Sequence, residues 1–195
     1  MVNPSMSEHV TGSVPAISAD LLNTDFFTLL GVPRRYAQDL GVLDSRFREL
    51  QREVHPDRFA ASDDAARRAS MMLATQINQA YQTLRSPLNR AVYLLGLSGI
   101  DVGAESNTAM VPVFLMAQME WREKAADARM SGDMVALKQL DSDIADTIQS
   151  SYNSLEKDLD VMGKTQQAAE TVRRLMFLEK LHLEIDNAIY DLEDV

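Results

Sequence analysis

The chain of 195 residues has no cysteine, few glycines and prolines, and no long apolar run. Without cysteine it has no disulfide, no thiol nucleophile and no cysteine-ligated zinc or iron–sulfur site of its own. No stretch reaches the roughly 18 apolar residues that cross a membrane. The 8 glycines and 6 prolines fall between segments of helical periodicity. These absences predict a mostly helical, soluble protein, and they fit a reducing cytoplasm.

Lysine and arginine are missing from residues 1–23, which also lack an apolar h-region. This excludes a secretory signal and an arginine-rich presequence. The serine, threonine, glycine and proline of the segment favour a flexible tail.

The formal net charge of −10 is unevenly distributed. Residues 24–100 contain ten arginines and eight carboxylates, whereas residues 101–195 contain nine basic residues and nineteen carboxylates. A chain this acidic is a poor general binder of nucleic acid or anionic membranes. The contrast between its halves predicts two parts with different partners.

Apolar residues in the front half recur at spacings of three and four, as in amphipathic helices. Asp25 and Asp39 stand where N-caps are expected, and Ser86-Pro87 restarts a helix with proline at its tolerated first position. The successive stripes are Phe26, Phe27, Leu29 and Leu30, then Leu40, Leu43, Phe47, Leu50 and Val54, then Ala69, Leu73, Ile77, Ala80 and Leu84, then Val92, Tyr93, Leu94, Leu95 and Leu97. The short connection between the second and third stripes predicts an antiparallel hairpin.

The back half begins after residues 99–110, which are low in bulky apolar residues and predict a linker. Three helical patterns follow in residues 111–195, separated near Gly132 and Gly163. The economical arrangement is an antiparallel three-helix bundle. The predicted fold class is therefore all-α, with a helical hairpin domain at residues 24–98 followed by this bundle.

The tripeptide His55-Pro56-Asp57 lies between the two helices of the hairpin, and Pro56 ends the first of them at His55. Alone it is a common turn. Its flanking segments are more specific. They are Phe26-Phe27-Thr28-Leu29-Leu30-Gly31-Val32-Pro33, Leu50-Gln51-Arg52-Glu53-Val54, Ile77-Asn78-Gln79-Ala80-Tyr81-Gln82-Thr83-Leu84 and Arg90-Ala91-Val92-Tyr93-Leu94-Leu95.

This pattern resembles the J domain, in which the second and third helices form a hairpin with His-Pro-Asp at its tip. The segment from Arg90 to Leu95 is similar to the HscB family in particular, the J-type co-chaperones of bacterial iron–sulfur cluster assembly. The resemblance covers Asp25 to Val195. It implies that residues 24–98 are a J domain that docks on the ATP state of a DnaK-type chaperone (HscA-like) and promotes hydrolysis.

Arginines near the tripeptide have suitable chemistry for such docking. Arg48 and Arg52 are four residues apart and share a helix face, while Arg46 flanks the apolar stripe on its other side. They can pair with carboxylates on the ATPase, or they can simply be a solvated face. The resemblance implies a chaperone-binding site at His55, Pro56, Asp57, Arg46, Arg48, Arg52 and Arg58.

The helix from Pro112 carries two apolar faces, although one is enough to pack it in a bundle. The core face has Phe114, Ala117, Trp121, Ala125 and Ala128, and the surplus face has Leu115, Met116 and Met119 with Glu120 and Glu123. Phe177 lies one residue out of phase with its own stripe, so we expect it to be exposed. The surplus suits a protein-binding patch, a wide buried face, or a contact with the J domain.

The segments Phe114–Glu123 and Val172–Leu181 are similar to HscB segments. The resemblance implies an apolar patch that grips the iron–sulfur scaffold protein (IscU-like), with a polar edge beside it. The patch would be Leu115, Met116, Met119 and Phe177, and the edge Glu120, Arg122 and Glu123. Ala117 and Trp121 depart from the residues expected there.

Two other classes of function compete with this interpretation. An enzyme would need a nucleophile, a metal cluster or a phosphate loop beside His55 and Asp57, and the sequence offers none. A J protein for another client is the second alternative, but the zinc-binding cysteines and the Gly/Phe-rich linker of general J proteins are missing. We therefore expect no catalytic residue, no cofactor and no metal.

Overall fold

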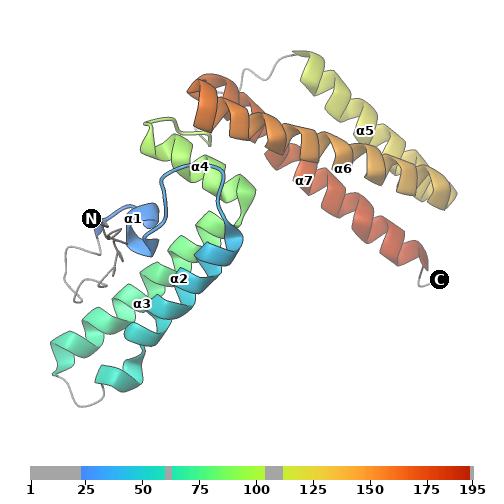
Figure 1. Cartoon of the computed structure of the whole chain (residues 1–195). Helices are drawn as coiled ribbons and strands as arrows, with labels where there is room; N and C mark the ends of the chain where they lie inside the picture. The colour runs from blue at the N-terminus through green and yellow to red at the C-terminus, as the bar shows by residue number, and fades with distance from the viewer. Residues whose placement is uncertain (1–22, 60–62, 104–111, 194–195) are drawn as a thin grey trace, which may run out of the picture.

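The computed structural model describes residues 23–59, 63–103 and 112–193, which contain helices and no strand. The α-helices are α1 (Phe26–Leu30), α2 (Leu40–Glu53), α3 (Asp64–Arg85), α4 (Pro87–Leu97), α5 (Pro112–Ser131), α6 (Met134–Glu156) and α7 (Thr165–Glu193). A 3₁₀ helix, η2 (Pro56–Phe59), follows α2, and a π-helix, η4 (Lys157–Met162), follows α6. Figure 1 shows two arms, a hairpin of α2 and α3 and a bundle of α5, α6 and α7, with α4 between them. The predicted all-α class, a hairpin followed by a three-helix bundle, is confirmed.

Side-chain caps start the front helices where the sequence predicts. The Asp25 carboxylate accepts from the amides of Phe27 and Thr28 at the start of α1. Burial works to raise the pKa of Asp25, but these bonds and one from the Thr28 hydroxyl outweigh it and hold the pKa below its ordinary value. Asp39 caps α2, and Ser86 both ends α3 and caps α4. Local chemistry alone thus fixes these boundaries.

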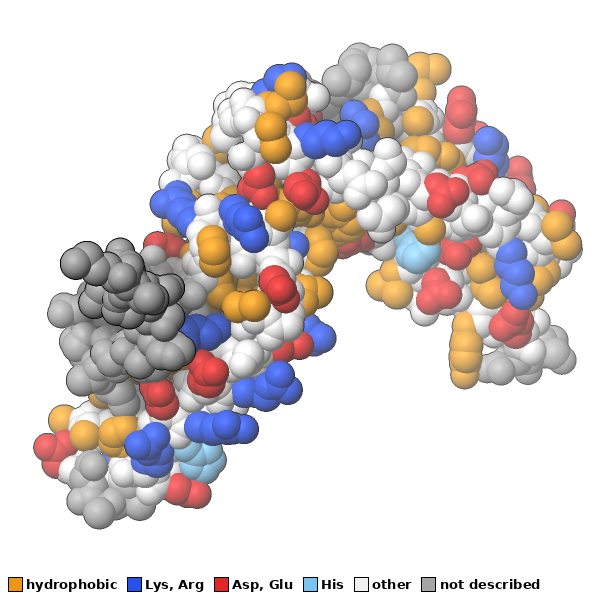
Figure 2. Space-filling view, viewed as in Figure 1, with side chains coloured by type: hydrophobic (Ala, Val, Ile, Leu, Met, Phe, Trp, Pro, Cys, Tyr) orange, Lys and Arg blue, Asp and Glu red, His pale blue; other side chains and the backbone are white. Residues whose placement is uncertain are grey.

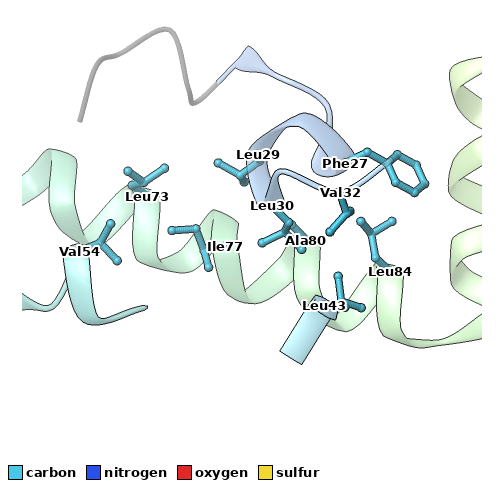
Figure 3. Packing of buried hydrophobic residues seen from close by; sticks show 10 residues of the cluster. All are labelled: Phe27, Leu29, Leu30, Val32, Leu43, Val54, Leu73, Ile77, Ala80 and Leu84. Carbon is cyan, nitrogen blue, oxygen red and sulfur yellow. The ribbon is translucent and has the colours of Figure 1, made fainter. Parts of the chain in front are cut away.

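The core of the hairpin arm lies where α1 crosses α3. Figure 3 shows its buried side chains, which come from α1, α2, α3 and the loops that adjoin them. They are Phe27, Leu29, Leu30, Val32, Leu43, Val54, Leu73, Ile77, Ala80 and Leu84. Burying each large member stabilises the fold by about 1.5–3 kcal/mol before entropy is counted. The α2–α3 hairpin is therefore a rigid support for the loop at its end.

The bundle is held mainly by α6 and α7. The buried residues of its outer part are Ala128, Leu137, Leu140, Ile144, Leu178, Leu181, Ile185 and Ala188. Among the described side chains of α5, Ala128 is the one that is fully buried. The helix α5 thus buries little of its own surface and leaves much of it to solvent.

A third cluster joins the two arms. Tyr36 from the α1–α2 loop packs with Ala91 and Leu95 of α4 and with Leu155 and Leu175 of the bundle. Val102 is also buried there, so the start of the predicted linker 99–110 belongs to a core. The remainder of that linker, and residues 1–22 of the predicted tail, lie outside the described residues.

Two local features differ from the sequence analysis. The pattern between Gly132 and Gly163 predicts one helix, but α6 changes to the π-helix η4 after Glu156. The predicted stripe of α3 begins at Ala69, but Ala69 is only half-buried. Its neighbour Ser70 is fully buried in its place. Both differences depend on contacts between distant segments, which a single-helix pattern does not contain.

Candidate functional sites

The loop after α2 presents two polar side chains to solvent. The side chains of His55 and Asp57 are 58% and 90% exposed. The Asp57 amide donates to His55 Nδ1 at 3.3 Å, and the Asp57 carboxylate lies 3.5 Å from the same nitrogen. The Arg58 amide donates to the His55 carbonyl at 3.0 Å and closes the first turn of η2. Imidazole and carboxylate are therefore held side by side and directed outwards; the side chain of Pro56 lies outside the described part of the structure.

The loop is anchored at its root by Ser70 on α3, a residue that is not among the predicted site residues. Val54, just before the loop, is 3% exposed and packs in the hairpin core. Its carbonyl accepts a hydrogen bond of 2.6 Å from the hydroxyl of Ser70 on α3, which is fully buried. The sequence does contain a signal for this anchor, because Ser70 is a small polar residue next to the apolar stripe of α3. The bond fixes the end of α2 to α3 directly behind His55.

The four predicted arginines are used differently by the fold. Arg48, Arg52 and Arg58 are exposed, and among the described residues none of them has an ion pair. Arg46 instead pairs with Glu49 at 3.2 Å. Its guanidinium also lies against Gly31, where a Cβ would come within 2.8 Å of Nη2. Figure 2 shows basic side chains gathered along the hairpin arm.

The surplus face of α5 is exposed, as the helical phase predicts. Met116 and Met119 are 65% and 64% exposed, and Glu120 and Glu123 are exposed beside them. The backbone of Leu115 belongs to the same helix, but its side chain lies outside the described residues. Two large apolar side chains thus stand next to two carboxylates on one solvent-facing arc.

Phe177 is half-buried, which corrects the expectation that it is exposed. Its ring meets Phe114 edge-on, with centroids 5.9 Å apart, and stacks on Trp121 at 6.5 Å. The cause is α5, which covers this side of α7 and places its own aromatic rings there. Because Phe177 is only partly buried, it links the core of the bundle to its surface.

Arginines from both helices cover this aromatic cluster. Arg122 of α5 lies over Phe177, and Arg174 of α7 lies over Phe114, each 5.3 Å from the ring centroid. Trp121 and Arg174 were not among the predicted site residues, and only the tertiary packing reveals them. The polar edge of the patch is therefore bound to its aromatic floor by cation–π contacts.

A groove between α5 and α7 starts at Arg122 and runs away from Phe177. Its volume is about 220 Å³, and Leu137, Leu181 and Ile185 lie along it. The groove exists because Ala125 and Ala126 on α5 are too small to fill the space. It gives the exposed patch an adjoining apolar recess.

Neither a metal site nor a membrane segment is found among the described residues. They contain no group of three or more histidine, aspartate or glutamate side chains arranged to hold a metal ion. No helix in the same part of the chain is long and apolar enough to cross a membrane. His182 lies 3.1 Å from Asp141 on α6, far from the loop that carries His55.

Known proteins similar to this chain share one description. The family described as "HSCB C-terminal oligomerisation domain" matches residues 110–186. A co-chaperone protein HscB homolog from Azoarcus sp. is 47% identical over 173 residues, covering 89% of this chain and 98% of that protein. The homolog from Paraburkholderia xenovorans is 49% identical over the same shares of the two chains.

Solved structures agree with these relatives. Chaperone HscB from Vibrio cholerae superimposes with a TM-score of 0.77 at 35% identity, covering 87% of this chain and 99% of that one. Human co-chaperone protein HscB gives a TM-score of 0.77 at 28% identity, over 84% of this chain and 81% of that one.

Proposed function

Because the chain belongs to the HscB family of co-chaperones, we propose that it carries two separate docking surfaces, one for an HscA-like chaperone and one for an IscU-like scaffold. The protein is a non-enzymatic co-chaperone of iron–sulfur cluster assembly. The observation that supports two surfaces is their position on different arms. The polar loop ends the hairpin, and the apolar patch lies on the bundle.

The chaperone-docking surface consists of His55, Pro56, Asp57, Arg46, Arg48, Arg52 and Arg58. His55 and Asp57 offer a donor or acceptor pair at a fixed offset, suited to a polar surface on the ATPase. The unpaired arginines on α2 and η2 attract carboxylates and orient the encounter. Arg46 lies at the edge of this surface and supports it, because its guanidinium is already paired with Glu49.

The scaffold-docking surface consists of Leu115, Met116, Met119, Glu120, Arg122, Glu123 and Phe177. Methionine side chains are flexible and polarizable, so they adapt to an apolar partner surface. The carboxylates and Arg122 form a rim that selects the orientation of the partner. The Arg122–Phe177 contact places that rim directly on the aromatic cluster.

These surfaces define the proposed domain division. Residues 1–23 form a tail, 24–98 the J domain, 99–110 a linker and 111–195 the scaffold-binding bundle. The bacterial relatives support a site of action in the bacterial cytoplasm.

A pair of variants tests the proposal. His55→Gln should abolish stimulation of the chaperone ATPase and leave scaffold binding intact, because the side chain is exposed and far from the patch. The double variant Met116→Ala with Phe177→Ala should lose scaffold binding and keep basal ATPase stimulation. ATP turnover by purified chaperone and calorimetric titration of the scaffold measure the two activities.

The circular dichroism of each variant controls for folding. If either variant loses both activities while its helicity is normal, the two surfaces are not separate. If the wild-type protein stimulates the chaperone but captures no iron–sulfur scaffold from a lysate, it serves a different client.

A further inference from the structure

Asp160 of the π-helix η4 bonds to the loop between α1 and α2. Its Oδ1 accepts from the amide of Tyr36 at 2.6 Å, and its Oδ2 accepts from the amide of Ala37 at 2.8 Å. Two successive backbone N–H groups form a concavity that favours an anion, and bonds to a carboxylate are stronger than neutral ones. One side chain of the bundle arm thus binds two amides of the hairpin arm.

The π-helix brings Asp160 to that position. A π-turn is wider than an α-turn, and such turns are frequent at functional sites. The turn ends at Gly163, whose φ of 63° a side chain would strain. The Lys164 amide donates back to the Asp158 carbonyl at 2.8 Å and closes the end. The backbone around Asp160 is therefore fixed on both sides.

The amides that Asp160 binds belong to a segment that is itself packed between the two arms. Tyr36 is 4% exposed and packs against α4, α6 and α7. Arg90 of α4 is 6% exposed and lies over the Tyr36 ring at 5.0 Å, while its Nη1 donates to the Leu84 carbonyl at 2.6 Å. Asp160, Tyr36, Ala37 and Arg90 thus form a joint, which connects the end of α3, the start of α4, the α1–α2 loop and the bundle.

The position of the joint in the chain gives it a functional meaning. Two residues separate Ala37 from the first residue of α2, and α2 carries Arg48 and Arg52 and leads directly to His55. Domains joined by modest interfaces normally move relative to each other. Here the loop that leads into α2 is bonded to the bundle, so the loop that carries His55 keeps one orientation relative to the patch on α5.

We propose that Asp160 is a positioning residue that fixes the angle between the chaperone-docking loop and the scaffold-docking patch, and that the bound scaffold enhances ATPase stimulation only when this angle is fixed. The inference rests on the proposed function. A rigid joint presents the client at one place on the chaperone, which raises its effective concentration there. A loose joint leaves both binding steps intact but spreads the client over many positions.

Two variants and a control separate this role from folding. Asp160→Ala removes both hydrogen bonds, and Asp160→Asn keeps the size but removes the charge and one acceptor. The control is Asp186→Asn, a charge change of the same size at an exposed position on α7. Because both amides are hydrogen-bonded, we expect the Tyr36 and Ala37 amides to exchange slowly with solvent in the wild type and in the control, and fast in Asp160→Ala.

Spin labels measure the angle directly, and the absence of native cysteine allows labelling without background. Cysteines replace the exposed Gln79 on α3 and the exposed Asn187 on α7. We expect one narrow distance distribution in the otherwise unchanged chain and a broad one in Asp160→Ala. A distribution that stays narrow while the two amides exchange fast would overturn the positioning role.

The functional experiment uses a purified HscA-like chaperone with and without an IscU-like scaffold. Without scaffold, Asp160→Ala should stimulate the ATPase as well as wild type, and it should bind scaffold with unchanged affinity. The extra stimulation that scaffold adds should fall about tenfold, with Asp160→Asn in between. Unchanged extra stimulation, or a loss of stimulation without scaffold, would overturn the inference.

The two proposals fail in different ways. If wild type neither stimulates the chaperone nor binds the scaffold, the proposed function is wrong, whereas the spin-label distances still decide whether Asp160 fixes the angle.

Discussion

Arg122 on α5 lies over the ring of Phe177 on α7, with its guanidinium carbon 5.3 Å from the ring centroid. Arg174 on α7 lies over Phe114 on α5 at the same distance. Each helix thus supplies a cation to an aromatic ring of the other. This reciprocal arrangement is how α5 holds on to α7 although its buried contribution is small, and it fixes the rim of the patch.

Replacing Arg122 with alanine should weaken scaffold binding about two- to fivefold, the value of one exposed ion pair with the partner. The cause is the loss of a fixed positive rim above Phe177. Arg122→Lys should be intermediate, because it keeps the charge without the planar stacking. Arg129→Ala is the matched control, since Arg129 is exposed on the same helix and pairs with Asp191. Equal weakening in Arg122→Ala and the control would show that net charge alone matters.

Trp121 should report scaffold binding by fluorescence. It is the one tryptophan of the chain, it is half-buried, and it stacks on Phe177. A partner that covers the patch removes water from the indole, so the emission should shift to shorter wavelength. The double variant Met116→Ala with Phe177→Ala should abolish the shift, and His55→Gln should retain it. An unchanged spectrum at saturating scaffold would place the partner elsewhere on the chain.

Ser70→Ala should destabilise the fold by about 1–3 kcal/mol, because it leaves the buried Val54 carbonyl without its partner. The same change loosens the root of the docking loop, so ATPase stimulation should fall even where the protein is fully folded. Urea unfolding and chaperone ATP turnover measure the two effects. Ser45→Ala, at an exposed position of α2, should change neither. Destabilisation without any loss of stimulation would show that the bond from Ser70 to Val54 does not position the docking loop.

The elements of this fold were predictable because local interactions set them. Asp25, Asp39 and Ser86 cap helices within three residues of themselves, and the apolar spacing of α3 and α7 matches most of their buried faces. The predicted stripe of α2 is only partly buried, since Leu43 is covered whereas Leu40 is 46% exposed. The exposed methionines of α5 were found by the same periodicity. These features need no knowledge of what lies across the fold.

The remaining features depend on pairs of residues far apart in the chain. Phe177 is half-buried because Trp121, 56 positions earlier in the numbering, covers it. In the sequence nothing distinguishes Asp160 from the other acidic residues, because its partner Tyr36 is 124 positions away. The π-helix has no periodic signal over its six residues. Assignment of the loop and the patch to partners came from family resemblance, because helical phase gives a spare apolar face without saying what covers it.

The joint should make the protein sensitive to alkali. Burial raises the pKa of Tyr36 to about 12, although the neighbouring Arg90 opposes the change, whereas an unfolded chain has a tyrosine pKa near 10.0. The folded state therefore holds this proton more tightly. Its contribution to stability is complete below the unfolded pKa and is lost as the pH rises through the folded one.

Tyr36→Phe keeps the ring beneath Arg90 and removes the ionisable group. Between pH 10 and about 12, the free energy of unfolding should fall less steeply with pH in this variant than in wild type. The difference in slope approaches one proton, or about 1.4 kcal/mol per pH unit. Burial also raises the pKa of Tyr152 and Tyr93, so both proteins retain some slope and the comparison isolates Tyr36. Urea unfolding at several pH values measures the slopes, and Tyr190→Phe, at an exposed site, should match wild type. Parallel curves for wild type and Tyr36→Phe would mean that the Tyr36 phenol ionises alike in the folded and unfolded chains, and that the joint is open to water.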